Sequence, residues 1–163
     1  MIKTEVLIVG GGPAGSSCAW QLKKAGMDCQ ILDRQEFPRV KPCAGWITPE
    51  LVRDLELNPS DYPYSFTTFK SFEIAIKKFK FHLPTHQHAI RRVEFDDYLL
   101  KRSGAQVKLH QVRTITKEPD GYSIDRAFFG KYLIGAGGTQ CPVNRQLFQP
   151  SEPRRPADLI VAM

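Results

Sequence analysis

The chain has 163 residues and a formal net charge of +6, and 42% of its residues are hydrophobic and 25% charged. This composition excludes a mainly disordered protein, and the length suits one compact domain. The longest apolar run near the N-terminus, residues 6–9, is far shorter than the roughly 20 residues of a membrane-spanning helix. Since no secretory signal pattern opens the chain, we expect a cytoplasmic protein.

The N-terminal segment has the pattern of a βαβ unit. Residues 5–9 form an apolar, β-branched run that ends in glycines, as in a buried parallel strand. Residues 13–25 follow as a helix, with Gly26 at the position of a C-terminal cap, and residues 29–33 form a second strand. This order predicts a Rossmann-like sheet with a right-handed connection between its strands.

The middle of the chain interrupts this alternation of strands and helices. After an irregular segment, Thr48 and Pro49 open a short helix as N-cap and first helical residue. Alternating apolar residues then predict a β-hairpin over residues 72–83, with one apolar face and its turn at Lys77 and Lys78.

Secondary structure typical of an α/β fold returns after the hairpin. The sequence predicts a helix over residues 94–103, two or three strands between 107 and 122, and a buried strand at 132–134. The expected fold class is therefore α/β, a Rossmann-like sheet with an antiparallel β insertion.

A glycine-rich turn joins the first strand to the first helix and satisfies the pattern G-x-G-x-x-G at Gly10, Gly12 and Gly15. Gly10 is expected to make the tight turn, Gly12 to let a pyrophosphate approach the backbone, and Gly15 to let the helix pack on the strand. Free N–H groups and the positive end of the helix dipole would hold the anion. The neighbouring Pro13 and Ala14 complete this predicted dinucleotide site.

Asp33 ends the second strand, 18 residues after Gly15. An acidic residue there accepts hydrogen bonds from ribose hydroxyls and repels a 2′-phosphate, which favours FAD or NAD over NADP. Arg34 is included among the predicted cofactor contacts. A strand-ending Asp that only holds a turn remains the alternative interpretation.

Three further segments have recognisable patterns. They are residues 37–49 with Pro-Cys-Ala-Gly at 42–45, the Arg-x-x-Phe-Asp-x-x-Leu of residues 92–99, and residues 134–145 with their glycine cluster. With the glycine turn, these segments resemble in their order the geranylgeranyl reductase family, part of the para-hydroxybenzoate hydroxylase-like flavoproteins. The resemblance implies a Rossmann-like FAD/NAD(P)-binding domain, of which residues 1–163 are the N-terminal portion and residues 66–90 a partial insertion from a substrate domain.

The resemblance implies that FAD lies extended across the glycine turn and Asp33. It further implies that Arg92 approaches the ribityl–phosphate portion, that the loop with Ala44 and Gly45 passes near the isoalloxazine, and that a backbone amide at Val112 meets the adenine. The second flavin fingerprint of the family falls on Gly135, Gly137 and Gly138.

Cys43 is the candidate catalytic residue, in a redox or substrate-gating role. Its neighbours Arg39 and Lys41 would favour a thiolate if it is exposed, and a small buried hydrophobic residue is the alternative. Two positions depart from the family pattern. Ala44 replaces a glycine and removes one site for a positive φ, and Gly137 replaces an Asp that would accept from the ribityl hydroxyls.

The resemblance implies an FAD-dependent oxidoreductase in which reduced flavin delivers a hydride to a carbon–carbon double bond of an isoprenoid-like, hydrophobic small molecule. Two alternatives stay open: an FAD-binding module without turnover of its own, and a flavin monooxygenase or halogenase of the same fold. Since no second G-x-G-x-x-G occurs, a nicotinamide would bind transiently elsewhere or not at all.

Other partners are inferred from charge, cysteines and length. Residues 70–113 carry ten basic and four acidic residues, a run that more often covers a solvated surface or meets small anions, so no nucleic-acid partner is expected. The four cysteines form no C-x-x-C pair and no metal site is expected.

Family members are typically more than twice as long as this chain, which ends at residues 159–163 in what reads as the start of a strand. A second chain or a missing C-terminal half is the expected partner, and a peripheral membrane contact stays open. The isolated chain is expected to lack turnover and to associate through the unpaired hairpin.

Overall fold

The computed structural model describes residues 1–152. The chain divides into two compact units, of which the first combines Met1–Phe37 with the segment that begins at Leu99, and the second is Pro38–Tyr98. The strand predicted at residues 159–163 lies outside the described residues. Among the helices that the structure describes, none is long and apolar enough to cross a membrane.

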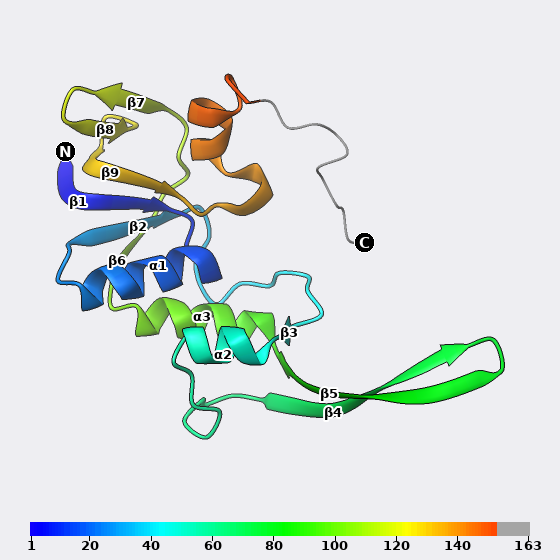
Figure 1. The fold of residues 1–163 in the computed structure, drawn as a ribbon. Coiled ribbons are helices and arrows are strands. Elements are labelled where there is room, and N and C mark those ends of the chain that lie inside the picture. Colours follow the sequence, from blue (N-terminus) through cyan, green and yellow to red (C-terminus); the bar gives the residue numbers. More distant parts are fainter. Residues whose placement is uncertain (153–163) are drawn as a thin grey trace. The chain divides into compact units, whose positions relative to one another are not determined.

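The first unit is built on a six-stranded mixed sheet with the order β6-β2-β1-β9-β8-β7 (Figure 1). Its strands β6, β2, β1 and β9 are parallel to one another, and β9, β8 and β7 form an antiparallel meander. In chain order the strands are β1 (Ile2–Val9), β2 (Cys29–Asp33), β6 (Gln106–Leu109), β7 (Ile115–Glu118), β8 (Gly121–Ile124) and β9 (Phe128–Gly135). The predicted α/β fold class is confirmed.

Alternate side chains of β1 enter two different cores. Val6 and Ile8 pack with Ala19 of helix α1 (Pro13–Lys24), whereas Leu7 and Val9 pack on the other side with residues of the meander and with Cys141 and Val143. Since both faces of β1 are covered, its sequence is a continuous apolar run and does not alternate.

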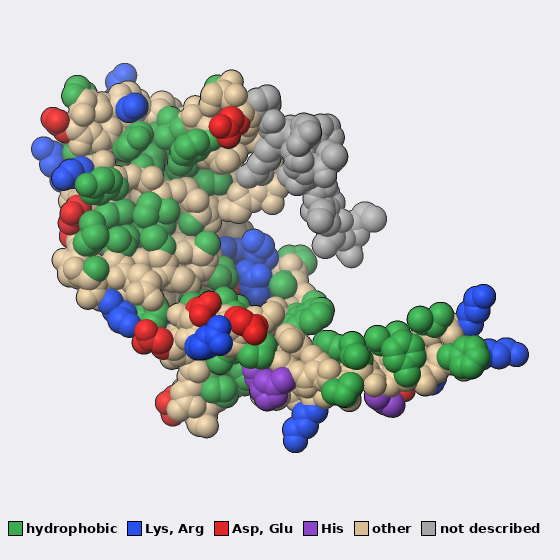
Figure 2. Space-filling model, in the orientation of Figure 1, with side chains coloured by type: hydrophobic (Ala, Val, Ile, Leu, Met, Phe, Trp, Pro, Cys, Tyr) green, Lys and Arg blue, Asp and Glu red, His purple; other side chains and the backbone are tan. Residues whose placement is uncertain are grey.

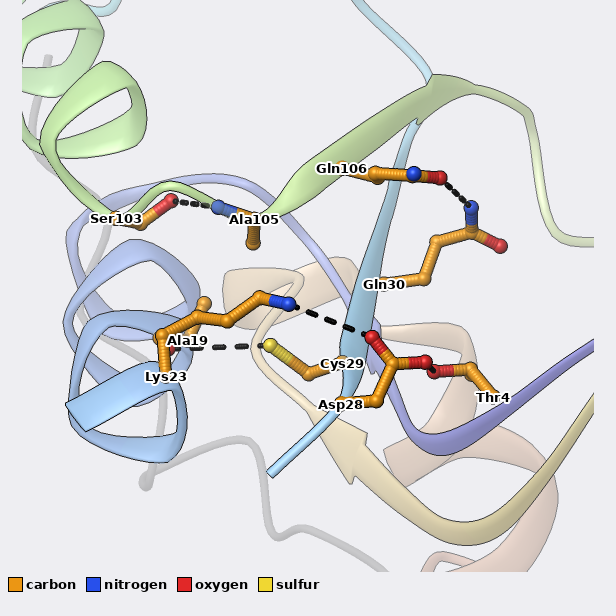
Figure 3. Close-up of polar contacts among 9 residues, drawn as sticks. All are labelled: Thr4, Ala19, Lys23, Asp28, Cys29, Gln30, Ser103, Ala105 and Gln106. Atoms are coloured by element: carbon orange, nitrogen blue, oxygen red, sulfur yellow. Dashed lines mark hydrogen bonds and ion pairs between the residues drawn. The ribbon is translucent and has the colours of Figure 1, made fainter. Parts of the chain in front are cut away.

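Polar contacts join α1 and β1 to the start of β2 (Figure 3). The Asp28 carboxylate accepts from Thr4 Oγ1 at 2.8 Å and from Lys23 Nζ at 3.4 Å. On the same strand, Gln30 donates from Nε2 to Gln106 Oε1 of β6 at 3.4 Å. These contacts join elements far apart in the sequence at the start of β2, away from the glycine turn.

Several elements are longer than their sequence pattern predicts. β1 begins at Ile2, three residues before its apolar run, because Ile2 pairs with Phe128 of β9. β9 covers Phe128–Gly135 for the same reason, although only residues 132–134 read as a buried strand. Pairing with a neighbouring strand supplies backbone hydrogen bonds regardless of side-chain pattern.

The second unit contains a three-stranded antiparallel sheet with the order β3-β5-β4. β3 (Trp46–Ile47) precedes the short helix α2 (Pro49–Asp54), whose N-cap Thr48 accepts from Leu51 N as predicted. β4 (Phe66–Ile76) and β5 (Phe79–Ile90) form a hairpin longer than the predicted residues 72–83. Helix α3 (Arg92–Arg102) starts two residues before the predicted position and runs from this unit into the first.

The apolar face of the hairpin is exposed along most of its length. Three cross-strand pairs form this face, Phe72–Leu83, Ile74–Phe81 and Ile76–Phe79. Phe79 is 79% exposed, and Figure 2 shows hydrophobic side chains in a row along the hairpin up to its lysine-rich turn. Lys77 takes a positive φ of 55° in that turn, a conformation that favours glycine or asparagine. Whether residues 66–90 belong to a substrate domain stays a prediction.

We predict that Gly15→Ala destabilises the protein by about 3 kcal/mol, because a Cβ at this position would overlap the Gly10 carbonyl oxygen. Gly26→Ala is the matched control. Its φ is 75°, but nothing lies within 4 Å of its Cβ position, so the cost is that of the left-handed conformation, about 1 kcal/mol. Urea unfolding of both variants measures the difference, and equal losses would contradict the close packing of α1 on the turn.

Candidate functional site

The carboxyl ends of β1, β2 and β9 meet at one edge of the first unit's sheet. Gly10 N donates to Leu32 O at 2.8 Å, and Ala136 N donates to Val9 O at 2.8 Å, so the turns after β1 and β9 begin side by side. The chain proceeds from β1 to β2 and β6 on one side and places β9 on the other. Ligands of open α/β sheets bind at such a switch point.

The glycine turn has no space for side chains at two positions. Gly10 has a φ of 111°, and a Cβ there would lie 2.6 Å from the carbonyl carbon of Ala136 and 2.7 Å from Gly137 Cα. At Gly15, a Cβ would collide with the Gly10 carbonyl oxygen. Gly12 differs, since it is the N-cap of α1 with a φ of −69°, which any residue can adopt.

The N-terminus of α1 is suited to an anion. No side chain caps it, no acidic residue lies in its first turn, and Pro13 occupies the first turn. Ser16 Oγ instead donates to Gly11 O at 2.9 Å and secures the turn from the buried side. An N-terminus without a side-chain cap, at the positive end of the helix dipole, fits the diphosphate of a dinucleotide.

The Asp33 carboxylate is committed to the turn itself. It is buried, and it accepts from Gly11 N at 2.6 Å and from Gln35 N at 2.9 Å. Asp33 therefore does hold the turn, as the alternative interpretation of the sequence proposed. Each carboxylate oxygen has a further lone pair, so the ribose contact stays a prediction. Arg34 is exposed beside it.

The second glycine cluster follows β9. Cβ atoms at Gly135 and Gly137 would lie 2.9 Å from Val143 Cβ and 3.2 Å from Cys141 Cα, so both positions are restricted by the following segment. Gly138 has a φ of 73° and open space around its Cβ position. An Asp at 137, usual in the resembled family, would press on Cys141 here.

Val112 lies in the loop between β6 and β7, and its partly buried side chain packs against the core. At the start of this loop, His110 N donates to Asp33 O at 2.7 Å. The predicted adenine contact thus lies in a loop bonded to the residue that holds the glycine turn.

The second unit contains the other predicted site residues, grouped around Cys43. The Cys43 side chain is exposed and accepts from Gly45 N at 3.4 Å. Gly45 has a φ of 75°, and a Cβ atom at this position would collide with the Ile90 carbonyl oxygen. Within this loop the structure describes a positive φ at Gly45 and not at Ala44, so the Gly-to-Ala departure removes no left-handed residue.

Arg92 begins α3 and forms a two-point ion pair with Asp96. Its Nε and a terminal nitrogen donate to the two carboxylate oxygens at 2.7 and 2.9 Å, and Asp96 is fully buried. The pair raises the pKa of Arg92, chiefly through the hydrogen bonds to Asp96. Asp96 is the Asp of the Arg-x-x-Phe-Asp-x-x-Leu motif, but no role was predicted for it, although Arg and Asp four residues apart on a helix are a readable signal.

The pKa of the Cys43 thiol is lowered, first by the Gly45 N–H and then by the hydrogen bond and charge of Arg92. Arg39 and Lys41, which were expected to favour the thiolate of an exposed Cys43, are not among the groups that shift this pKa. Charges adjacent in the sequence need not lie near the sulfur, whereas the loop brings Cys43 to the first residue of α3.

The predicted site residues thus fall into two groups, one in each unit. The first unit holds Gly10, Gly12, Pro13, Ala14, Gly15, Asp33, Arg34, Val112, Gly135, Gly137 and Gly138, and the second holds Cys43, Ala44, Gly45 and Arg92. The glycine turn, the Asp33 carboxylate and the uncapped helix end of the first unit have the arrangement expected of a dinucleotide-binding site.

Comparison with known proteins specifies the dinucleotide. Residues 3–57 match the family described as FAD binding domain. This segment contains β1, the glycine turn, α1 and Asp33, and its match identifies FAD as the cofactor class. The resemblance to the geranylgeranyl reductase family is also confirmed, by relatives that match parts of the chain.

Two relatives illustrate the extent of the match. An uncharacterized protein of Methanosarcina barkeri is 39% identical in an alignment of 159 residues that covers 89% of this chain and 40% of that protein. Digeranylgeranylglycerophospholipid reductase 2 of Methanopyrus kandleri is 32% identical over 120 residues, 70% of this chain and 30% of the reductase. The chain therefore spans less than half the length of the relatives it matches.

Solved structures share the fold. A geranylgeranyl bacteriochlorophyll reductase-like protein from Thermoplasma acidophilum has a TM-score of 0.68 and 22% identity, over 82% of this chain and 38% of that one. The halogenase PltM in complex with phloroglucinol and FAD has a TM-score of 0.72 and 20% identity, over 88% and 36%. At these identities the likeness concerns the fold alone.

We predict that Arg92→Gln slows alkylation of Cys43 by iodoacetamide severalfold near neutral pH, because loss of the guanidinium raises the thiol pKa and lowers the thiolate fraction. The control is Arg91→Gln, which removes an exposed cation that pairs with Glu94 instead. Mass spectrometry of the Cys43 peptide follows the reaction, with circular dichroism to verify folding. Equal rates in the two variants would show that Arg92 does not act on the sulfur.

Proposed function

We propose that this chain is the FAD-binding part of a reductase of the geranylgeranyl reductase type, acting on a carbon–carbon double bond of an isoprenoid-like molecule. The observation that carries the proposal is the uncapped N-terminus of α1 behind the glycine turn, held by Asp33, within a segment that matches FAD-binding domains. Bound FAD, once reduced, supplies a hydride at its flavin ring.

Residues of the first unit would bind and orient the cofactor. The N–H groups at the start of α1 receive the diphosphate, and the close approach at Gly10 and Gly15 keeps them in place. Asp33 retains lone pairs for the ribose hydroxyls while it holds Gly11 N. These contacts recognise the adenosine diphosphate half, which FAD shares with other dinucleotides.

Residues of the second unit are proposed to serve the flavin half. Arg92 is held in one orientation by the buried Asp96 and offers a fixed positive charge to a phosphate or ribityl oxygen. Cys43 lies next to this guanidinium as an exposed thiol of lowered pKa, and its proposed role is redox or substrate gating.

Sequence similarity favours a reductase over a monooxygenase or halogenase. The named relatives above 30% identity are reductases, among them a geranylgeranyl diphosphate reductase, a digeranylgeranylglycerophospholipid reductase and a menaquinone reductase, whereas the halogenase likeness is one of fold. Fold alone does not determine the reaction. The isoprenoid-like substrate is therefore proposed on the sequence relatives and not on the geometry of the chain.

We predict that the chain binds FAD and that Gly12→Val abolishes binding, because the branched side chain would occupy the approach of the diphosphate. The φ of −69° at Gly12 tolerates valine, so the backbone of the turn should be preserved. Ala25→Val, at the exposed end of the same helix, is the control and should bind FAD normally. Flavin fluorescence on titration measures affinity, and full affinity in Gly12→Val would refute the assigned site.

A product assay separates the reaction classes. The protein is loaded with FAD, reduced with dithionite and incubated with geranylgeranyl diphosphate, with and without oxygen. A reductase adds two hydrogen atoms to the substrate without oxygen, whereas a monooxygenase adds an oxygen atom only when oxygen is present.

For the 163-residue chain alone we expect FAD binding without turnover. The exposed face of the hairpin would not exclude water from the reduced flavin and its substrate. Saturation of a prenyl double bond by this chain would contradict that expectation.

A further inference from the structure

The loop that carries Val112 is held by one acidic residue from the turn between β8 and β9. The Asp125 carboxylate accepts from Arg113 N at 3.1 Å and from Thr114 N at 2.7 Å. It also contacts His110 Nε2 at 2.7 Å, and because a carboxylate only accepts, this ring nitrogen carries the proton. Asp125 thus binds both ends of residues 110–114.

The same loop is bonded to the glycine turn on its other side. His110 N donates to Asp33 O at 2.7 Å, and the Asp33 carboxylate accepts from Gly11 N at 2.6 Å. A continuous series of hydrogen bonds therefore runs from Asp125 through His110 and Asp33 to the turn where the diphosphate is proposed to bind. All of these residues belong to the first unit.

Further contacts fix the loop but do not use the backbone of Val112. Gln146 accepts from Ile115 N and donates to Arg113 O, both at 3.0 Å, and Asp125 N donates to Thr114 O at 3.0 Å. None of the bonds named here involves the N–H or C=O of Val112, while its side chain packs inward against the core. The loop is thus held around a residue whose peptide groups remain outside these bonds.

Asp125 adopts a conformation that is unfavourable for a non-glycine residue. Its φ is 50°, and that of Arg126 is 55°, in the left-handed region. Burial raises the pKa of Asp125, but the hydrogen bonds from His110, Arg113 N and Thr114 N outweigh it, so the pKa lies below its usual range. The carboxylate is therefore ionised at neutral pH and its bonds are charge-assisted, which is the stronger kind.

We propose that Asp125 and His110 are positioning residues that shape residues 110–114 so that the backbone of Val112 recognises the adenine of the dinucleotide. This inference rests on the proposed function and adds the residues that set its base specificity. A backbone N–H and C=O in fixed positions can match the acceptor N1 and donor amino group of adenine. They mismatch hypoxanthine, whose N1–H donates and whose oxygen accepts.

Titration calorimetry with ADP and inosine diphosphate tests this proposal without any need for turnover. The wild-type protein should bind ADP about tenfold more tightly than inosine diphosphate, the size of effect expected when a buried hydrogen bond is lost. Asp125→Ala should weaken ADP about tenfold and bring the ratio of the two affinities close to one. Asp120→Ala removes an exposed carboxylate from the neighbouring β7–β8 turn and should retain both affinities.

A second variant separates positioning from folding. His110→Phe keeps an aromatic ring against Phe128, whose ring centroid lies 4.9 Å from that of His110, but removes the bond to Asp125. It should also lower the preference for ADP. Unchanged discrimination in a folded Asp125→Ala or His110→Phe protein overturns the proposal, as does a wild-type protein that binds FAD and both diphosphates without discrimination. A wild-type protein that binds neither FAD nor ADP overturns the proposed function itself.

Discussion

The close approach of backbone atoms at Gly10 and Gly15 is the constraint on which the first unit depends. No side chain separates the Gly10 carbonyl from Gly15, or Gly10 from the Ala136–Gly137 backbone. The end of β1, the start of α1 and the turn after β9 therefore meet at one place. A methyl group at either glycine would displace the helix end or β9, and the N–H groups at the proposed diphosphate site would move with them.

Asp33 holds together the elements around the proposed ligand site. Its carboxylate accepts from Gly11 N and Gln35 N, while its backbone carbonyl accepts from His110 N. One residue thus connects the glycine turn, its own strand end and the loop after β6. Since a buried carboxylate is stable only when it is hydrogen-bonded, these donors are required with or without a ligand. The proposed site for the adenosine half is therefore largely preformed by contacts within the chain.

The second unit uses a buried charge in a different way. Asp96 is fully buried, and Arg92 offsets its desolvation with two parallel hydrogen bonds. Separating the two groups would leave a buried charge without a partner, which costs free energy. This orientation brings a guanidinium to Cys43 and lowers the pKa of its thiol. Other basic residues of the segment 70–113 also have partners: Lys80 pairs with Glu73, Arg91 pairs with Glu94, and Arg102 stacks over Trp20.

The sequence by itself determined the features that depend on neighbours in the chain. The glycine spacing, the apolar run of β1 and Asp33 at the end of β2 predicted the βαβ unit and its nucleotide site, because turn geometry and strand burial are local requirements. The apolar face of the β4–β5 hairpin followed from alternation in the same way. Only the tertiary structure decided which distant groups meet: Ile2 with Phe128, Cys43 with Arg92 and Asp125 with His110. Hydrogen bonds and ion pairs form between groups that folding brings within about 3 Å, and no spacing along the chain records that distance.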